Sequence, residues 1–96
     1  MTYSEFLLST ESDCPPQQLS PYLLALWHEK RGDWDAAHEI VQNMDSTTAE
    51  HIHAYLHRVE GDNWNADYWY RRAGLTRPGS DLPGEWEAIA RSLIDT

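Results

Sequence analysis

The chain lacks several features that define large protein classes. Cys14 is the only cysteine among its 96 residues, so an internal disulfide is excluded and a reducing compartment is favoured. No charged start leads into an apolar segment near Met1, and no apolar run is long enough to span a bilayer. We therefore expect a soluble, cytoplasmic protein with no membrane partner.

Basic side chains are also scarce. Seven lysines and arginines stand against 16 acidic residues, which gives a net charge of −9 and argues against nucleic acid as a partner. Most of the arginines lie in the stretch 58–77, which contains four arginines and three acidic residues. Two interpretations stay open for this stretch: solvated salt bridges with neighbouring carboxylates, or a site for an acidic peptide.

Catalytic motifs are missing as well. The sequence contains no glycine-rich phosphate loop and no G-x-S-x-G. The zinc-protease pattern H-E-x-x-H fails, because Gly32 stands where His28-Glu29 would need a second histidine. Cys14 has no cationic neighbour in the sequence that would activate its thiol. We expect no catalytic residue and no cofactor.

What the sequence does contain is a repeat with an offset of 29 residues. Five residues of the first copy recur in the second: Ala25, His28, Gly32, Asp33 and Ala37 become Ala54, His57, Gly61, Asp62 and Ala66. Glycine can close a helix in the left-handed conformation, and an aspartate directly after it can cap the next helix. The repeat therefore predicts two helical hairpins in an all-α protein.

The remaining patterns place the other helices in a single domain covering residues 1–96. We expect a short helix at 3–9, a first hairpin at about 20–45, a second at about 47–74 and a final helix at about 82–95. The third helix carries an apolar stripe that extends to Met44, and Thr47 with Glu50 predicts a capping box before the fourth. The final helix should cap the stack, with an apolar inner face and these residues facing solvent: Glu85, Glu87, Arg91 and Asp95.

Residues 61–78 resemble the second half of a tetratricopeptide repeat. The matching residues are Gly61, Asp62, Ala66, Tyr70, Ala73 and Pro78. The first half departs from the family pattern, and the offset of 29 is shorter than the family's 34. The stretch 21–78 is also similar to a group of small bacterial proteins of unassigned function. The family resemblance implies antiparallel helical hairpins stacked around a helix-lined groove that binds a protein or peptide.

Three histidines are candidates for that groove. His53 and His57 lie four residues apart and so share one helix face, and His28 holds the position equivalent to His57 in the first repeat. The spacing of His53 and His57 could hold a divalent transition metal. The alternative is that these histidines are hydrogen-bonded packing residues.

The segment Trp69-Tyr70-Arg71-Arg72 is the second candidate for a binding site. Aromatic and arginine side chains supply most strong anchors at protein interfaces. Helical geometry turns Tyr70 inward, leaves Tyr68, Arg71 and Arg72 near the surface, and does not decide the direction of Trp69. The alternative is an aromatic core with solvated arginines. We predict a non-enzymatic module that binds a protein or peptide, and self-association is equally compatible with the sequence. The competing hypothesis is a protein that binds a metal or a small molecule through its histidines.

Overall fold

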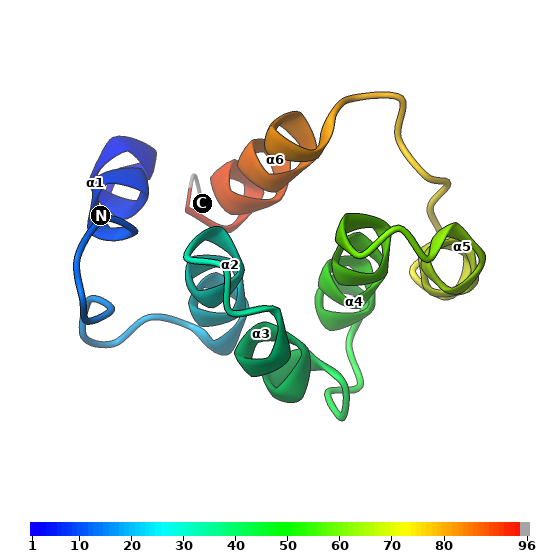
Figure 1. Cartoon of the computed structure of the whole chain (residues 1–96), viewed down its shortest axis with the longest axis horizontal. Coiled ribbons are helices and arrows are strands. Elements are labelled where there is room, and N and C mark those ends of the chain that lie inside the picture. Colours follow the sequence, from blue (N-terminus) through cyan, green and yellow to red (C-terminus); the bar gives the residue numbers. More distant parts are fainter. Residues whose placement is uncertain (95–96) are drawn as a thin grey trace.

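The structure is a computed structural model that describes residues 1–94 (Figure 1). Its helices are α1 (Tyr3–Ser9), α2 (Pro21–Lys30), α3 (Trp34–Val41), α4 (Thr47–Val59), α5 (Asn63–Arg72) and α6 (Leu82–Ile94). No strand occurs in the described range, which confirms the predicted all-α class. Within residues 1–94, every helix falls short of the length and apolar character that crossing a bilayer requires.

Both predicted glycine turns are present. Gly32 and Gly61 have φ angles of 86° and 84°, in the left-handed region that glycine adopts without steric cost. Asp33 and Asp62 follow them, and each side chain accepts a hydrogen bond from the amide three residues further on. Because these turns are short, α2 packs back along α3, and α4 packs back along α5.

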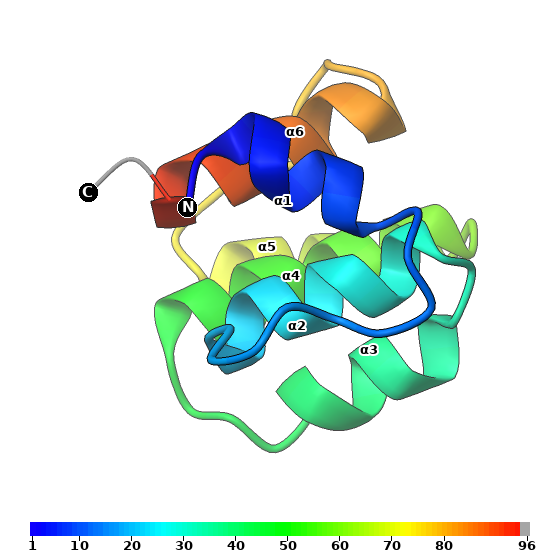
Figure 2. The same cartoon turned by 90° about the vertical axis from the view of Figure 1, so that its left-hand side faces the viewer.

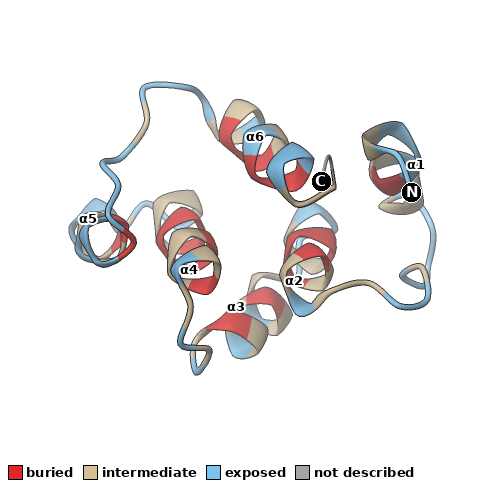
Figure 3. Ribbon diagram, turned by 180° about the vertical axis from the view of Figure 1, so that it is seen from behind, coloured by how far each residue is buried: buried red, intermediate tan, exposed pale blue. Residues whose placement is uncertain are grey.

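Helix α4 lies at the centre of the molecule and contacts α2, α3, α5 and α6 (Figure 1). Buried positions recur around it, and include Ile52, Tyr55 and Leu56 (Figure 3). A helix surrounded in this way has little open surface. Its polar side chains must therefore find partners on neighbouring helices.

Helix α6 joins the start of the chain to its middle. It packs across α2 and α4, and α1 packs on α6 (Figure 2). The Trp86 ring stacks on Phe6 with ring centroids 5.7 Å apart, and its Nε1 donates to the Leu26 carbonyl at 3.1 Å. One buried tryptophan therefore links α1, α2 and α6, and α6 covers one side of the α2–α4 pair.

The end of α3 differs from the prediction. The helix stops at Val41, although the apolar stripe extends to Met44. Met44 still packs against the core, and its amide donates to the Val41 carbonyl at 3.1 Å in a turn. The apolar pattern thus continues beyond the helix because a turn also directs Met44 inward.

The predicted cap of α4 is wrong. Ser46, rather than Thr47, is the N-cap, and its hydroxyl accepts from the Ala49 amide at 3.1 Å. Ser46 has the extended backbone that an N-cap requires, with φ −146° and ψ 155°. Glu50 forms an ion pair with Arg72 instead of completing a capping box.

The polar face of α6 is only partly as predicted. Arg91 is exposed and pairs with Glu87, one turn earlier. Asp95 lies outside the described residues. Glu85 is 3% exposed, so its predicted position on the solvent face is wrong. A buried carboxylate needs partners, and these lie on α4 and α5.

Candidate functional site

Three histidine rings meet where α3 packs on α4. They belong to His38, His53 and His57, and one ring nitrogen from each lies within 4.8 Å of those of the other two. The Nε2 atoms of His38 and His53 are 3.1 Å apart and share a hydrogen bond. The rings of His53 and His57 stack with centroids 4.9 Å apart. The structure therefore brings together the predicted pair and adds His38.

His28, the other predicted groove histidine, lies outside this cluster. Its ring contacts Trp27 on the same helix, with centroids 5.2 Å apart. The repeat makes His28 equivalent to His57, but His28 lies on α2, whereas the cluster forms where α3 packs on α4. Equivalence in the repeat therefore does not bring the two side chains together.

Two tryptophans flank the histidine cluster. Trp34 stacks on His38 with centroids 4.7 Å apart, and Trp69 stacks on His53 at 4.0 Å. Trp34 is itself held by a 2.6 Å hydrogen bond from its Nε1 to the Leu56 carbonyl. Trp69, whose direction the sequence left open, is partly buried against Ala54, Ala66 and Tyr70 as well as His53. The indole rings restrict the histidine orientations and shield them from water.

A carboxylate orients the third histidine. Glu60 lies one turn after His57, and its Oε1 is 2.6 Å from His57 Nδ1. A proton on Nδ1 would be donated to this carboxylate, which leaves Nε2 with its lone pair. This carboxylate–imidazole contact is the arrangement that commonly supports metal-bound histidine.

The surroundings of His53 and His38 favour neutral imidazole. Burial, followed by the neighbouring His38 and His57, lowers the pKa of His53 to about 4. Burial and then His57 also lower the pKa of His38, while Glu60 acts in the opposite direction. Neutral imidazole keeps a lone pair on one nitrogen and can act as a hydrogen-bond acceptor or a metal ligand.

A second polar cluster surrounds Glu85 on another side of α4. Its carboxylate accepts from Arg58 Nη1 at 2.8 Å and from the Tyr70 hydroxyl at 2.6 Å, and it lies 3.2 Å from His51 Nε2. Burial pushes the pKa of Glu85 upward, but the bonds from His51, Tyr70 and Arg58 hold it below its usual value. This is a buried carboxylate whose charge is matched by its partners.

The outer face of α5 carries the second set of predicted residues. Tyr68 is 41% exposed and Tyr70 is fully buried, as the helical pattern predicted. Trp64, one turn before Tyr68, is 78% exposed. Arg71 is exposed and has no ion pair or hydrogen-bonded side chain within residues 1–94. Positions 64, 68 and 71 share one helix face, so two exposed aromatic rings and an arginine lie in one row.

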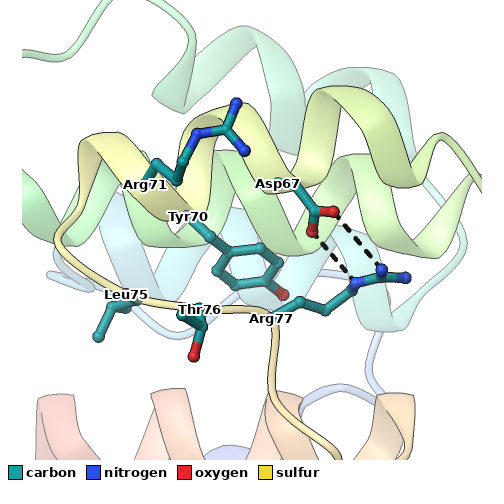
Figure 4. A pocket seen from close by; sticks show the side chains of 6 residues that line it. All are labelled: Asp67, Tyr70, Arg71, Leu75, Thr76 and Arg77. Atoms are coloured by element: carbon teal, nitrogen blue, oxygen red, sulfur yellow. Dashed lines mark hydrogen bonds and ion pairs between the residues drawn. The ribbon is translucent and has the colours of Figure 1, made fainter.

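The other arginines near α5 already have partners. Arg72 Nε lies 3.1 Å from Glu50, and its guanidinium lies over the Trp69 ring at 5.0 Å. Arg77 Nε lies 3.1 Å from Asp67, beside a hollow of about 370 Å³ (Figure 4). In Figure 4 the Arg71 side chain also borders this hollow but lies apart from the Asp67–Arg77 pair.

Sequence reasoning missed His38 of the histidine cluster and Trp64 on the outer face of α5. His38 was not a candidate, although it lies one turn after Trp34 on a helix predicted to pack beside its neighbours. Trp64 precedes Tyr68 by four residues, and that spacing alone would have placed both on one face. The signal for Trp64 was local, whereas that for His38 depended on how α3 meets α4.

Comparison with known proteins gives no further guide to these sites. The sequence matches no protein-family model, and neither a curated protein nor a solved structure is significantly similar to it.

Proposed function

We propose that the chain is a non-enzymatic interaction module that binds an acidic segment of a partner protein through the outer face of α5. Its plan would be that of two stacked, tetratricopeptide-like hairpins with α6 as a cap. The observation that carries the proposal is the row formed by Trp64, Tyr68 and Arg71. Exposed tryptophan, tyrosine and arginine are the side chains most enriched at binding hot spots.

We place the binding surface on α5 because other helices cover the other candidate surface, the groove along α2 and α4. In tetratricopeptide-like proteins the expected groove would lie along α2 and α4. Here α3 packs on one side of these helices and α6 on the other. The Tyr55 hydroxyl, for example, donates to the Leu82 carbonyl at the start of α6. Helix α5 packs mainly on α4 and keeps its outer face open.

The charge of the proposed partner follows from the arginines. Arg58, Arg72 and Arg77 each form an ion pair within the chain, so little of their charge is available. Arg71 has no such partner among residues 1–94. A carboxylate bound in the adjacent hollow would pair with Arg71, while apolar groups beside it would cover Trp64 and Tyr68. The exposed thiol of Cys14 is compatible with a reducing compartment such as the cytoplasm.

The experiment compares two peptides that differ only in charge. One contains aspartate and glutamate around a single leucine, and the other has asparagine and glutamine at the same positions. We expect the acidic peptide to bind more tightly, with affinity that falls as salt is added. Binding should shift the indole N–H signal of Trp64 in two-dimensional NMR spectra. Arg71→Glu should weaken binding at least about tenfold, because an anchor becomes repulsive.

Arg91→Glu is the matched control. It reverses the same charge on α6, where Arg91 pairs with Glu87, and should leave peptide binding unchanged. Equal affinity for the acidic and amide peptides would contradict the proposal. Concentration-dependent dimerisation that disappears in Arg71→Glu would instead identify a second copy of this acidic chain as the occupant.

A further inference from the structure

We infer that His38, His53 and His57 form a binding site for one divalent transition-metal ion of the zinc class. The inference is independent of the acidic-peptide proposal, because these side chains lie on α3 and α4 and the peptide surface lies on α5. The sequence suggested only His53 and His57 as possible metal ligands. Two histidines at this spacing are weak evidence for a metal site. A third histidine ring beside them supplies the three protein ligands that an open zinc site uses.

The distances suit a four-coordinate metal. With Zn–N bonds of about 2.0–2.1 Å, tetrahedral geometry separates two nitrogen ligands by about 3.3 Å. The Nε2 atoms of His38 and His53 are already 3.1 Å apart. One ring nitrogen of His57 lies within 4.8 Å of a ring nitrogen of each of the other two histidines, so a bound ion would have to draw the rings together. The helical spacing of His53 and His57, together with the packing of α3 on α4, thus brings three imidazole rings to one place.

The surroundings hold the rings in place. Trp34 stacks on His38 and Trp69 stacks on His53, so neither imidazole can turn freely. Glu60 binds Nδ1 of His57 and leaves the opposite nitrogen for a metal. A carboxylate behind a ligating histidine fixes its tautomer and increases its basicity. The site thus has three candidate ligands, aromatic walls and one outer carboxylate.

The ligand type selects the class of ion. Three neutral imidazoles suit Zn²⁺, Cu²⁺ or Ni²⁺, whereas Mg²⁺ and Ca²⁺ require oxygen ligands. His38 and His57 are only partly buried, so the fourth position would be open to water.

The test uses the full, untagged chain after removal of metals with a chelator. Titration with Zn²⁺ near neutral pH should show one ion per chain, and Mg²⁺ or Ca²⁺ should not compete. Co²⁺ should give the intense visible absorption of a four-coordinate site. His38→Gln and His57→Gln should each weaken Zn²⁺ binding by at least about tenfold, and Glu60→Gln should do so by about tenfold through its outer contact. Imidazole nitrogen NMR shifts should change for the three cluster histidines only.

His28→Gln is the matched control, since it removes a histidine outside the cluster and should bind Zn²⁺ as the wild type does. His53→Phe preserves a stacked ring at the most buried position and should lose the metal. If this variant does not fold, the partly buried positions 38 and 57 still decide the question. Failure of the wild type to bind Zn²⁺, or binding that is unchanged in His38→Gln and His57→Gln, would overturn the inference. Neither result depends on whether an acidic peptide binds α5.

Discussion

Two polar clusters lie on different sides of α4, and they provide partners for buried polar side chains in different ways. Around Glu85, a negative charge is met by Arg58, with additional hydrogen bonds from other helices. Around His53, the partners are two more histidines and an indole ring. The first cluster satisfies itself by pairing opposite charges. The second directs three like side chains toward one another.

The difference follows from helical geometry. His51 and Arg58 lie seven residues apart on the face of α4 that meets α6, where Glu85 is located. His53 and His57 lie on another face, toward α3 and α5. Because α4 is covered on several sides, both faces are dry enough for polar contacts to matter. One helix thus carries a charge-paired cluster on one face and a histidine cluster on another.

The largest effect should come from breaking the charge pair at Glu85. Arg58→Met leaves a 3% exposed carboxylate without its cation, and we expect the free energy of unfolding to fall by about 3 kcal/mol. Urea denaturation near neutral pH measures this loss. Adding Glu85→Gln should recover part of it, because the uncompensated charge is then removed.

Arg91→Met is the control for this prediction. Its ion pair with Glu87 is exposed, and its guanidinium also lies 4.2 Å from the centroid of the Tyr3 ring; we expect the substitution to cost about 1 kcal/mol, well below the effect of Arg58→Met. If Arg58→Met lowered the free energy of unfolding no more than Arg91→Met does, the ion pair at Glu85 would not stabilise the fold more than an exposed ion pair.

Acidification should separate the two clusters in metal-free protein. The folded pKa of His53, near 4, lies below its ordinary 6.5, so the unfolded chain takes up the proton first. Stability from this group is complete above pH 6.5 and declines as the pH falls toward 4, and His38, whose folded pKa is also lowered, acts in the same direction. The folded pKa of Glu85 lies below its ordinary 4.5, so its contribution is lost only below that pH.

Variants identify each window. In urea denaturation curves recorded across this pH range, His53→Phe should flatten the upper window. Glu85→Gln should flatten the lower one. A single loss below pH 4.5 that is unaffected by His53→Phe would contradict the assignment of the upper window to the histidine cluster.

The sequence contained the local parts of this comparison. The turns at Gly32 and Gly61 were predictable because left-handed backbone and aspartate capping involve only neighbouring residues. Tyr70 was correctly turned inward for the same reason, since its direction follows from helical period. Most residues on the outer face of α5 could therefore be predicted from the sequence, with the exception of Trp64.

The two clusters on α4 could not be predicted from the sequence, because the residues of each cluster come together only where particular helices pack on one another. Glu85 was placed in solvent by its charge, yet its partners Tyr70 and Arg58 lie 15 and 27 positions away. His38 joins His53 across 15 residues, through contact between α3 and α4. Periodicity identifies the face of a helix, but it does not say which residues of another helix face it.

The smallest effect should come from His53→Phe near neutral pH without metal. Phenylalanine keeps the ring stacked on Trp69 and removes one hydrogen bond, to His38. His38 is only half-buried, so water can satisfy its freed nitrogen, and we expect a loss of about 1 kcal/mol or less in the free energy of unfolding. Urea denaturation beside Arg58→Met provides the comparison. A loss as large as that of Arg58→Met would show that the histidine contacts stabilise the fold as strongly as the charge pair, and the distinction between the two faces of α4 would then disappear.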